Sequence, residues 1–354
     1  MITADLDAEL LGSLHAMAEA GELPEEAVLA PGGTWRPVAD GPANYATSLP
    51  FEIGRLAGRP PAEIAAAIAP RLAAVPWIDA ARPSGDGYLN ITISPDALAS
   101  VARQIVAAGG GCARSEILRG TSAVLRAWPD PAAAPTWQQA WQEQADAMTG
   151  RLAEAAGAST GLRSGPERGV STGRSHPAAN SPVLAAVAYF GVSAVRYQLA
   201  RTVPGRADEL DRLVSVRQRE PDPYVAVQLA HADAASTLRW AADLTAGRDD
   251  PGEKLAAALA SEAEQALLGL LSWLPVRVAS AARRQRPDEV PRYLEEVAAS
   301  WAACKQVSPA LPFGGSAATG DPVTVSARLL LADAVRAVLE AGLALTGITA
   351  RDRI

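Results

Sequence analysis

One stretch decides the fold of the N-terminal part of the chain, Gly85-Asp86-Gly87-Tyr88-Leu89-Asn90-Ile91-Thr92-Ile93. Its first three residues are a turn signal, and the residues after them alternate between polar and apolar side chains. Successive side chains of a strand point to opposite faces of a sheet. The leucine and the isoleucines therefore face a core, and Tyr88 and Asn90 face the other side. The stretch predicts a strand with one polar face.

Helical patterns lie on both sides of this strand. Apolar residues recur at helical spacing over Leu6–Met17, Ile64–Leu72 and Leu98–Ile105. Pro60-Pro61 is typical of the start of the second helix, and Ser94-Pro95 is typical of the start of the third. Residues 1–108 are therefore predicted to form a small α/β domain with a short antiparallel sheet.

Residues 109–182 carry weaker patterns. Ala123–Trp128 is compatible with a strand and Trp137–Leu152 with a helix. Gly157–Pro182 is rich in Gly, Ser and Pro, contains three arginines and has almost no large apolar residues, which is typical of a flexible linker. Such arginines either are solvated or follow an RNA backbone. We expect a remnant or linker that is partly disordered.

From residue 183 to 354 the pattern is helical almost to the end, which predicts an all-α bundle and a chain that is α+β and mainly α overall. Two segments of this part are basic. Six arginines against three acidic residues give residues 196–219 a local net charge of +3, and Pro287 exposes the Arg283-Arg284-Gln285-Arg286 run. These segments are either salt-bridged, solvated helix surface or sites of phosphate or acidic-partner contact. The candidates for RNA backbone contact are Arg196, Arg201, Arg283, Arg284 and Arg286.

Composition excludes several classes of protein. The 354 residues carry a formal net charge of −7, so the surface as a whole is not basic, and this charge is compatible with a local basic patch. Two cysteines and three histidines offer neither a disulfide framework nor a metal site, which fits a reducing cytoplasm. No run of about 18 apolar residues occurs, so no membrane span is expected. Of 32 basic residues 30 are arginines, which reflects either a GC-rich coding sequence or phosphate binding.

The C-terminal part resembles a known domain. The matching stretches are Gln228-Leu229-Ala230-His231-Ala232, Pro291-Arg292-Tyr293-Leu294-Glu295-Glu296-Val297-Ala298, Ser326-Ala327-Arg328-Leu329-Leu330-Leu331, Gly342-Leu343-Ala344-Leu345-Thr346-Gly347-Ile348 and Ala350-Arg351-Asp352-Arg353-Ile354. Together they resemble the helical, DALR-type anticodon-binding domain at the C-terminus of arginyl-tRNA synthetases. The resemblance spans residues 225–354.

The N-terminal part resembles the additional N-terminal domain of the same family. The matching stretches are Asn44-Tyr45-Ala46-Thr47, Pro60-Pro61-Ala62-Glu63-Ile64-Ala65 and Gly87-Tyr88-Leu89-Asn90-Ile91. In that family the strand after the glycine turn presents an aromatic and an amide side chain to the tRNA D-loop. The resemblance therefore implies that Tyr88 and Asn90 contact the tRNA elbow. The alternative is an ordinary solvated strand face.

The chain cannot assemble the catalytic signatures of that family. Amino-acid activation there uses a His-x-Gly-His type and a Lys-Met-Ser-Lys type signature, which stabilise the pentavalent phosphate. This chain has three histidines, His15, His176 and His231, which lie far apart, and two lysines, Lys254 and Lys305. We therefore expect no catalytic residue, no cofactor and no metal.

The predicted helix that contains Gln228–Ala232, which we call the signature helix, departs from the usual family sequence at three positions. Family members usually carry two tyrosines that stack on anticodon bases and an arginine, where this chain has Ala226, Leu229 and Asp233. The residues that keep the frame of the anticodon domain are Gln228 and His231, with Tyr224 two residues before the first lost tyrosine. His231 is expected to be a packed helix histidine.

Two functions remain open. The first is a non-catalytic tRNA-binding protein, derived from arginyl-tRNA synthetase, that presents or sequesters tRNA; the resemblance makes tRNA-Arg the first candidate. The second is a protein–protein scaffold or adaptor that has lost RNA binding and partners an active enzyme. The missing signatures argue against a third interpretation, that the chain is itself an arginine–tRNA ligase.

Overall fold

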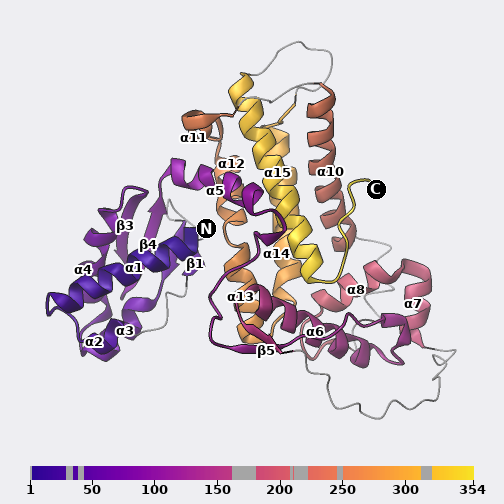
Figure 1. Cartoon of the computed structure of the whole chain (residues 1–354), viewed down its shortest axis with the longest axis horizontal. Helices are drawn as coiled ribbons and strands as arrows, with labels where there is room; N and C mark the ends of the chain where they lie inside the picture. Colours follow the sequence, from indigo (N-terminus) through magenta and orange to yellow (C-terminus); the bar gives the residue numbers. More distant parts are fainter. Residues whose placement is uncertain are drawn as a thin grey trace. The chain divides into compact units, whose positions relative to one another are not determined.

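The computed structural model describes residues 2–28, 35–38, 44–161, 181–207, 210, 222–244, 250–311 and 321–354, and is mainly helical (Figure 1). It divides into two compact units. The first unit contains Met1–Val101 and Glu253–Ala260, and the second contains Ala102–Gly252 and Ser261–Ile354. The predicted fold class, a small sheet-containing N-terminal domain and a helical C-terminal domain, is confirmed.

The first unit contains a four-stranded antiparallel sheet in the order β1-β2-β4-β3. The strands are β1 (Trp35–Pro37), β2 (Tyr45–Thr47), β3 (Ile78–Ser84) and β4 (Tyr88–Ile93). Along β4, buried residues alternate with half-buried ones, as the sequence predicted. The central strand therefore has one face on the core and one polar face.

Helices cover the core face of this sheet. The helices of the unit are α1 (Ile2–Glu19), α2 (Glu25–Val28), α3 (Leu49–Ala57), α4 (Pro61–Ala73), the first half of α5 (Pro95–Ala108) and α11 (Leu255–Ala258). The apolar stripe predicted for the first helix is buried in α1. Helix α4 buries Ile64, Ile68 and Leu72 and packs against β3 and α1.

The segment predicted as a poorly ordered middle is folded over residues 109–161, and residues 162–180 lie outside the described residues. It contains η1 (Gly109–Gly111), β5 (Ser122–Val124), η2 (Pro131–Ala133), α6 (Trp137–Ala155) and β6 (Ser159–Gly161), with β5 parallel to β6. Helix α6 buries Trp137 and Ala140 in a cluster with Val183, Val195 and Leu199. This burial, together with packing of α6 on α13, holds the segment in the second unit.

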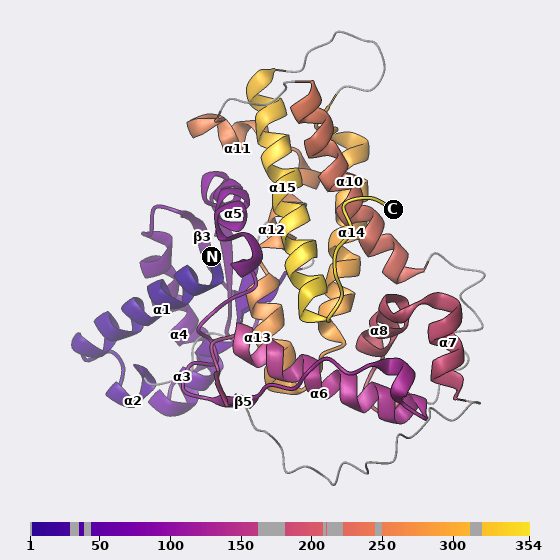
Figure 2. The same ribbon diagram turned by 45° about the vertical axis from the view of Figure 1, so that its right-hand side comes forward.

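The remaining helices of the second unit form a bundle. They are α7 (Pro182–Phe190), α8 (Val192–Arg201), α10 (Pro223–Asp243), α12 (Glu262–Leu271), α13 (Leu274–Arg284), α14 (Glu289–Val307) and α15 (Pro322–Leu345). Helices α10, α14 and α15 lie side by side in both views (Figures 1 and 2). Gly342 allows the backbone of α15 to approach Leu294, because a Cβ there would collide with the leucine side chain. The long helices of this bundle position the surfaces described below.

Within the described residues, no single helix is long and apolar enough to cross a membrane. Helices α12 and α13, which are bent by 42° at their junction, would together satisfy that test by length and composition alone. Both bury their apolar residues against α14 inside the second unit, which is how core helices of a folded domain behave.

Candidate nucleic-acid interface

The polar face of β4 places an aromatic ring and an amide next to cations. Tyr88 and Asn90 lie on this face and are half-buried. In the register of the sheet, Asn90 lies opposite Ala46 on one side and Arg82 on the other, and Ala46 lies opposite Arg36. Residues directly opposite each other share a face. Exposed arginines of β1 and β3 therefore share the face of Asn90.

The ring of Tyr88 is held on two sides. Phe51 of α3 meets it edge-on, with the ring centroids 5.0 Å apart. The guanidinium carbon of Arg36 lies 4.1 Å from the Tyr88 ring centroid, in a cation–π arrangement. The ring, its cation and the neighbouring amide thus form one patch, which we call the β4 face: Arg36, Arg82, Tyr88 and Asn90.

The turn before β4 fixes where this patch lies. Gly87 has a φ of 143°, a conformation that side-chain-bearing residues rarely adopt. A Cβ at this position would collide with Pro61, whose carbonyl carbon would lie 3.0 Å away. The glycine therefore lets the turn rest on the first residue of α4, immediately before Tyr88.

On α10, the residues that keep the family frame hold the C-terminal tail. The Gln228 amide donates from Nε2 to the Thr349 carbonyl (3.0 Å) and accepts at Oε1 from the Arg351 amide (3.0 Å). His231 Nδ1 lies 3.1 Å from the Arg351 carbonyl oxygen, which can only accept, so Nδ1 carries the proton. Both side chains are buried, at 2% and 1% exposure. Their described contacts are intramolecular.

Tyr224 has a similar role inside the domain. It is half-buried, and its ring centroid lies 5.7 Å from that of the buried Tyr197. The Tyr197 hydroxyl donates to the Pro291 carbonyl (3.1 Å) and lies 3.3 Å from a Glu295 carboxylate oxygen. Burial is the main cause that raises the pKa of this phenol. Tyr224 therefore packs inward against an anchored ring, and nothing in its contacts replaces the lost stacking platforms.

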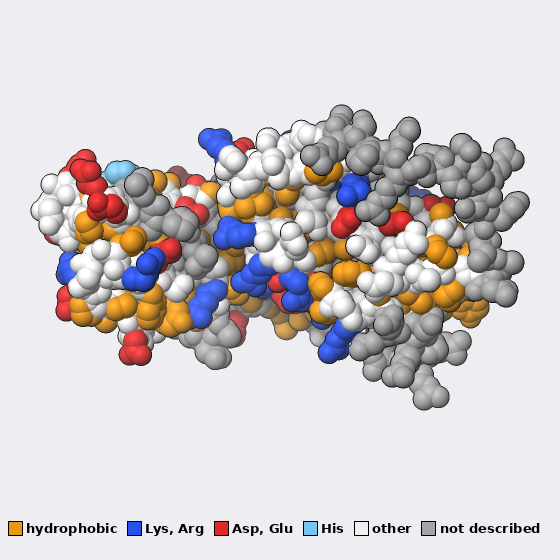
Figure 3. Space-filling model, turned by 90° about the horizontal axis from the view of Figure 1, so that it is seen from below, with side chains coloured by type: hydrophobic (Ala, Val, Ile, Leu, Met, Phe, Trp, Pro, Cys, Tyr) orange, Lys and Arg blue, Asp and Glu red, His pale blue; other side chains and the backbone are white. Residues whose placement is uncertain are grey.

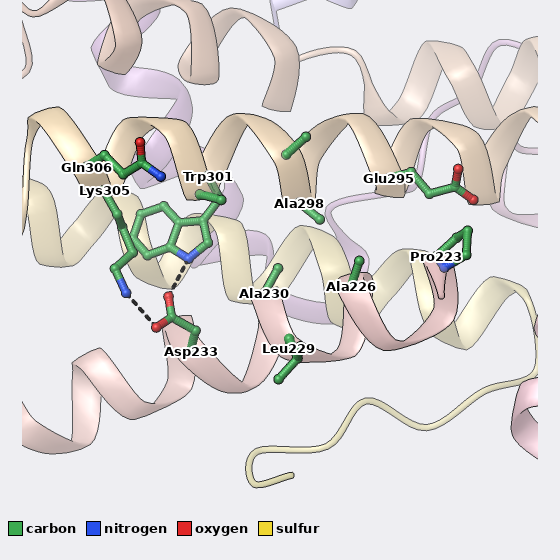
Figure 4. Close-up of a pocket in the computed structure, with 12 residues that line it drawn as sticks. Pro223, Ala226, Leu229, Ala230, Asp233, Glu295, Ala298, Trp301, Lys305 and Gln306 are labelled. Carbon is green, nitrogen blue, oxygen red and sulfur yellow. Dashed lines mark hydrogen bonds and ion pairs between the residues drawn. The ribbon is translucent and has the colours of Figure 1, made fainter. Parts of the chain in front are cut away.

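The positions that lack the family's tyrosines line an apolar groove. Ala226 of α10 faces α14 across a cavity of about 770 Å³, with Ala298 and Trp301 on the α14 side, and Leu229 lines the rim and points away from α14 (Figure 4). Leu229 is 50% exposed. Small side chains on both helices leave the space open. We call it the α10–α14 groove.

Asp233, at one end of this groove, is neutralised within the domain. Its carboxylate accepts from the indole Nε1 of Trp301 (2.8 Å) and from Nζ of Lys305 (2.5 Å), as Figure 4 shows. Asp233 therefore adds little unpaired negative charge at this end of the groove. The replacement of a cation by an anion on α10 is offset by a lysine on α14.

Two candidate backbone contacts, Arg196 and Arg201, are already engaged. The Arg196 guanidinium donates to the carbonyls of Gly347 (2.8 Å) and Pro129 (2.7 Å), and burial lowers its pKa. Arg201 donates from Nε to Glu295 (2.7 Å), and both side chains are largely shielded from solvent. The structure thus gives both residues packing roles, and their contact with RNA stays a prediction.

The second candidate cluster, Arg283, Arg284 and Arg286, contains one arginine that is paired with a buried carboxylate and two that are exposed. Arg286 makes a bidentate pair with the fully buried carboxylate of Asp288, both contacts at 2.8 Å, and these hydrogen bonds raise its pKa. Arg284 is 69% exposed and lies 3.5 Å from Glu289. Arg283 is exposed. On the face drawn in Figure 3, cationic side chains are interspersed with apolar and acidic ones, so they form no continuous basic surface there.

Arg212, Arg217 and Arg219 of the basic segment lie outside the described residues, as do the linker arginines Arg163, Arg168 and Arg174.

Both cysteines of the described residues are buried. Burial raises the pKa of Cys112 to about 12 and that of Cys304 to about 11, so both thiols stay protonated near neutral pH. Among the described ranges, no group of three His, Cys, Asp or Glu side chains is placed to hold a metal ion.

The sequence analysis named Tyr88 and Asn90 as candidates but not Arg36 and Arg82, which lie on the same face; a role of any of the four in RNA binding stays a prediction. Arg36 lies on a three-residue strand without an alternating pattern, and Arg82 precedes the glycine turn. Only the register of the sheet brings them to Asn90. The sequence shows that arginines occur near the strand, but their number alone does not tell on which face of the sheet they lie.

Comparisons with known proteins agree with both parts of this fold. Residues 227–354 match the model of the DALR anticodon binding domain, and residues 16–93 match the Arginyl tRNA synthetase N terminal domain. Similar curated proteins include the arginine–tRNA ligases of Bifidobacterium longum strain DJO10A (33% identity over 184 residues) and Kineococcus radiotolerans (34% over 164 residues). These matches cover 48% and 46% of this chain, and 29% of each ligase. The chain thus matches less than a third of the length of these relatives.

A solved structure shows the same fold. The structure of Thermus thermophilus arginyl-tRNA synthetase aligns with a TM-score of 0.61 and 14% sequence identity, covering 100% of both chains. At this identity the likeness establishes the fold alone.

Proposed function

We propose that this chain, which joins an arginyl-tRNA synthetase N-terminal domain to a DALR anticodon-binding domain, binds tRNA without activating an amino acid. The observation that carries the proposal is the β4 face, where a half-buried tyrosine and an asparagine share one side of a sheet with two exposed arginines. Its biological role would be to present or sequester tRNA.

The chemistry of the β4 face fits an RNA loop. Unpaired bases stack on aromatic rings, and each stack contributes about 1–3 kcal/mol. Asn90 offers both a donor and an acceptor to a base edge or a ribose hydroxyl. The Arg36 guanidinium is exposed, so it can move from the Tyr88 ring to a phosphate when a base takes its place. The loops of the tRNA elbow supply unpaired bases next to phosphates.

The C-terminal domain contributes less to RNA binding in this proposal. Ala226 and Leu229 offer no ring for an anticodon base, and Gln228 and His231 are occupied by the C-terminal tail. Arg196 and Arg201 are bound within the domain. Recognition would therefore lie mainly at the elbow, with tRNA-Arg as the first candidate because the similar proteins are arginine–tRNA ligases.

The proposal that no amino acid is activated rests on the sequence. The three histidines and two lysines of the chain cannot form the two nucleotide signatures of the ligases. We expect no arginine-dependent ATP–pyrophosphate exchange by the purified protein. Exchange at a rate above that of an equally purified mock preparation would refute this part.

The direct test is a titration of fluorescently labelled tRNA with the full chain at two salt concentrations. Binding is expected, and it should weaken steeply with salt because phosphate contacts release counterions. Tyr88→Ala with Asn90→Ala should reduce the affinity strongly. Thr92→Ala, on the same face of the same strand, is the matched control and should leave it nearly unchanged.

A second candidate function, a protein adaptor without RNA binding, is favoured by the apolar α10–α14 groove. The same titration separates the two functions. Absence of tRNA binding at the lower salt concentration would overturn the tRNA-binding proposal and favour the adaptor.

A further inference from the structure

Helix α10 carries an apolar stripe that the described part of the bundle leaves exposed. Val225, Leu229, Trp240 and Leu244 are 41%, 50%, 62% and 64% exposed. The first three belong to α10, and Leu244 is its C-cap. At 100° per residue these four positions fall on one side of the helix, next to the α10–α14 groove. Over 21 residues the stripe is about 30 Å long.

The spacing of this stripe is that of a helix that pairs with another helix. On the same side of the helix, Ala226, Leu229, Asp233, Ser236 and Trp240 follow one another at alternating intervals of three and four residues, with the two polar residues in the middle. This is the a/d repeat by which two helices pack along their length. An exposed apolar stripe with this repeat indicates a helix as its occupant.

The stripe is complementary to itself in an antiparallel arrangement. Under a twofold axis that passes between Ala234 and Ala235, Leu229 of one copy lies opposite Trp240 of the other. The same operation places Val225 opposite Leu244, and Asp233 opposite Ser236. Large apolar residues thus meet large apolar residues, and the two symmetry-related pairs of Asp233 with Ser236, near the centre, each join a carboxylate acceptor to a hydroxyl donor. The exposed Asp243 lies opposite Ala226, at the end of the contact where its carboxylate can stay in water.

The surroundings of the stripe are compatible with a second copy of α10. The α10–α14 groove lies beside Leu229, and its alanine-rich walls leave room for the larger side chains of a second helix. Asp233 brings no unpaired charge into the contact, because Lys305 and Trp301 of the same copy already bind its carboxylate. Burying an unpaired carboxylate would be costly, and here that cost is avoided.

We propose that this chain forms a twofold homodimer through antiparallel pairing of α10 with α10 of a second copy. The same patch serves on both subunits, as a twofold interface requires. Because tRNA binding is proposed for the first unit, the dimer stands independently of that function.

The test is the mass of the full chain in solution without RNA, measured by light scattering over about 1–100 µM, a range that detects micromolar association. The wild-type protein is expected at twice the chain mass of 36.6 kDa. Leu229→Glu and Trp240→Lys should each weaken dimerisation by about tenfold or more, because each places a charge against an apolar side chain. Tyr189→Glu, a 73% exposed residue of α7, should leave the mass unchanged.

The pairing of Leu229 with Trp240 is tested by mixing the two variants. In the mixed dimer the introduced glutamate faces the introduced lysine, and the second Leu229–Trp240 contact is intact. An equimolar mixture should therefore dimerise where each variant alone is monomeric. Circular dichroism melting of each variant verifies that the exposed substitutions leave the fold unchanged.

Three results would overturn the proposal. If the wild-type protein is a monomer over the whole concentration range, the stripe binds a different protein or RNA instead of a second copy. Adding tRNA to the same sample distinguishes these two partners. Dimers in both charged variants place the interface elsewhere. A mixture that stays monomeric contradicts the antiparallel register.

Discussion

The β4 face and the signature helix α10 are the two places where family resemblance leads one to expect RNA contacts, and they differ in what their residues do. On β4, Tyr88 and Asn90 are half-buried and lie beside exposed arginines. On α10, Gln228 and His231 are buried and bind the backbone of the C-terminal tail. A residue that matches a family motif can therefore either lie at the surface, where a ligand reaches it, or be buried and hold the domain together. The burial and the partners of its side chain distinguish the two roles.

The difference has a physical basis. A buried amide whose donor and acceptor are both satisfied inside the protein cannot serve a ligand without breaking those bonds, which costs about 1–3 kcal/mol for each group left unpaired. A half-buried ring under the guanidinium of an exposed arginine has no such obstacle. The comparison predicts that RNA affinity resides on β4 and that domain stability resides on the α10 motif.

The largest expected effect on RNA affinity comes from removing the two β4 side chains. Tyr88→Ala with Asn90→Ala should weaken tRNA binding by about 2–4 kcal/mol, because a base stack and a hydrogen-bonding amide are lost together. Fluorescence anisotropy with labelled tRNA measures it. Equal affinities for this variant and the Thr92→Ala control would remove β4 from the interface.

The neighbouring arginines should have a smaller effect with a different signature. Arg36→Gln with Arg82→Gln removes two cations, so the slope of log affinity against log salt should become shallower by about 1.5–2. At low salt the loss in affinity should be about tenfold. If the slope stays as in the wild type, neither arginine contacts a phosphate.

Gln228→Ala should affect stability and hardly affect RNA. Loss of its two bonds to the tail should lower the free energy of unfolding by about 2 kcal/mol, measured by urea denaturation. The tRNA affinity should stay within about threefold of the wild type. Gln306→Ala, an exposed glutamine of α14, is the control for stability. A large loss of affinity without loss of stability would give Gln228 a role in binding.

The smallest change in RNA affinity is expected from restoring the lost rings on α10. Ala226→Tyr with Leu229→Tyr should strengthen tRNA binding by less than about threefold, because the surrounding contacts on this helix serve the protein itself. The same titration measures it. A gain in tRNA affinity as large as the loss caused by the β4 variant would contradict this. It would show that α10 binds anticodon bases once the two tyrosine rings are present.

The sequence predicted the parts of the fold that rest on local patterns. The alternation in residues 88–93 gave the strand and its polar face, and the helical stripes gave α1, α4 and the bundle. The contacts of Gln228 and His231 were not accessible in this way, because their partners lie more than a hundred residues away. Neither were the carbonyl partners of Arg196.

The middle of the chain shows the same limit. Residues 109–182 carry weak local patterns and were expected to be partly disordered, with a possible helix over Trp137–Leu152; the structure has that helix, and Trp137 and Ala140 are buried against helices after residue 182. A truncation that begins at Val183 would therefore expose this core. For this reason substitutions in the full chain test the domains better than a fragment that starts at Val183.

One measurement tests the central claim, that RNA contacts lie on the β4 face and not on α10. A photoreactive amino acid is placed at Ser84, which lies opposite Tyr88 in the sheet, or at Leu229 on the exposed side of α10. After irradiation with tRNA, the crosslinked nucleotides are mapped by primer extension. The account predicts crosslinks from position 84 to the elbow loops and none from position 229. Crosslinks from position 229 to the anticodon loop, with none from position 84, would contradict it.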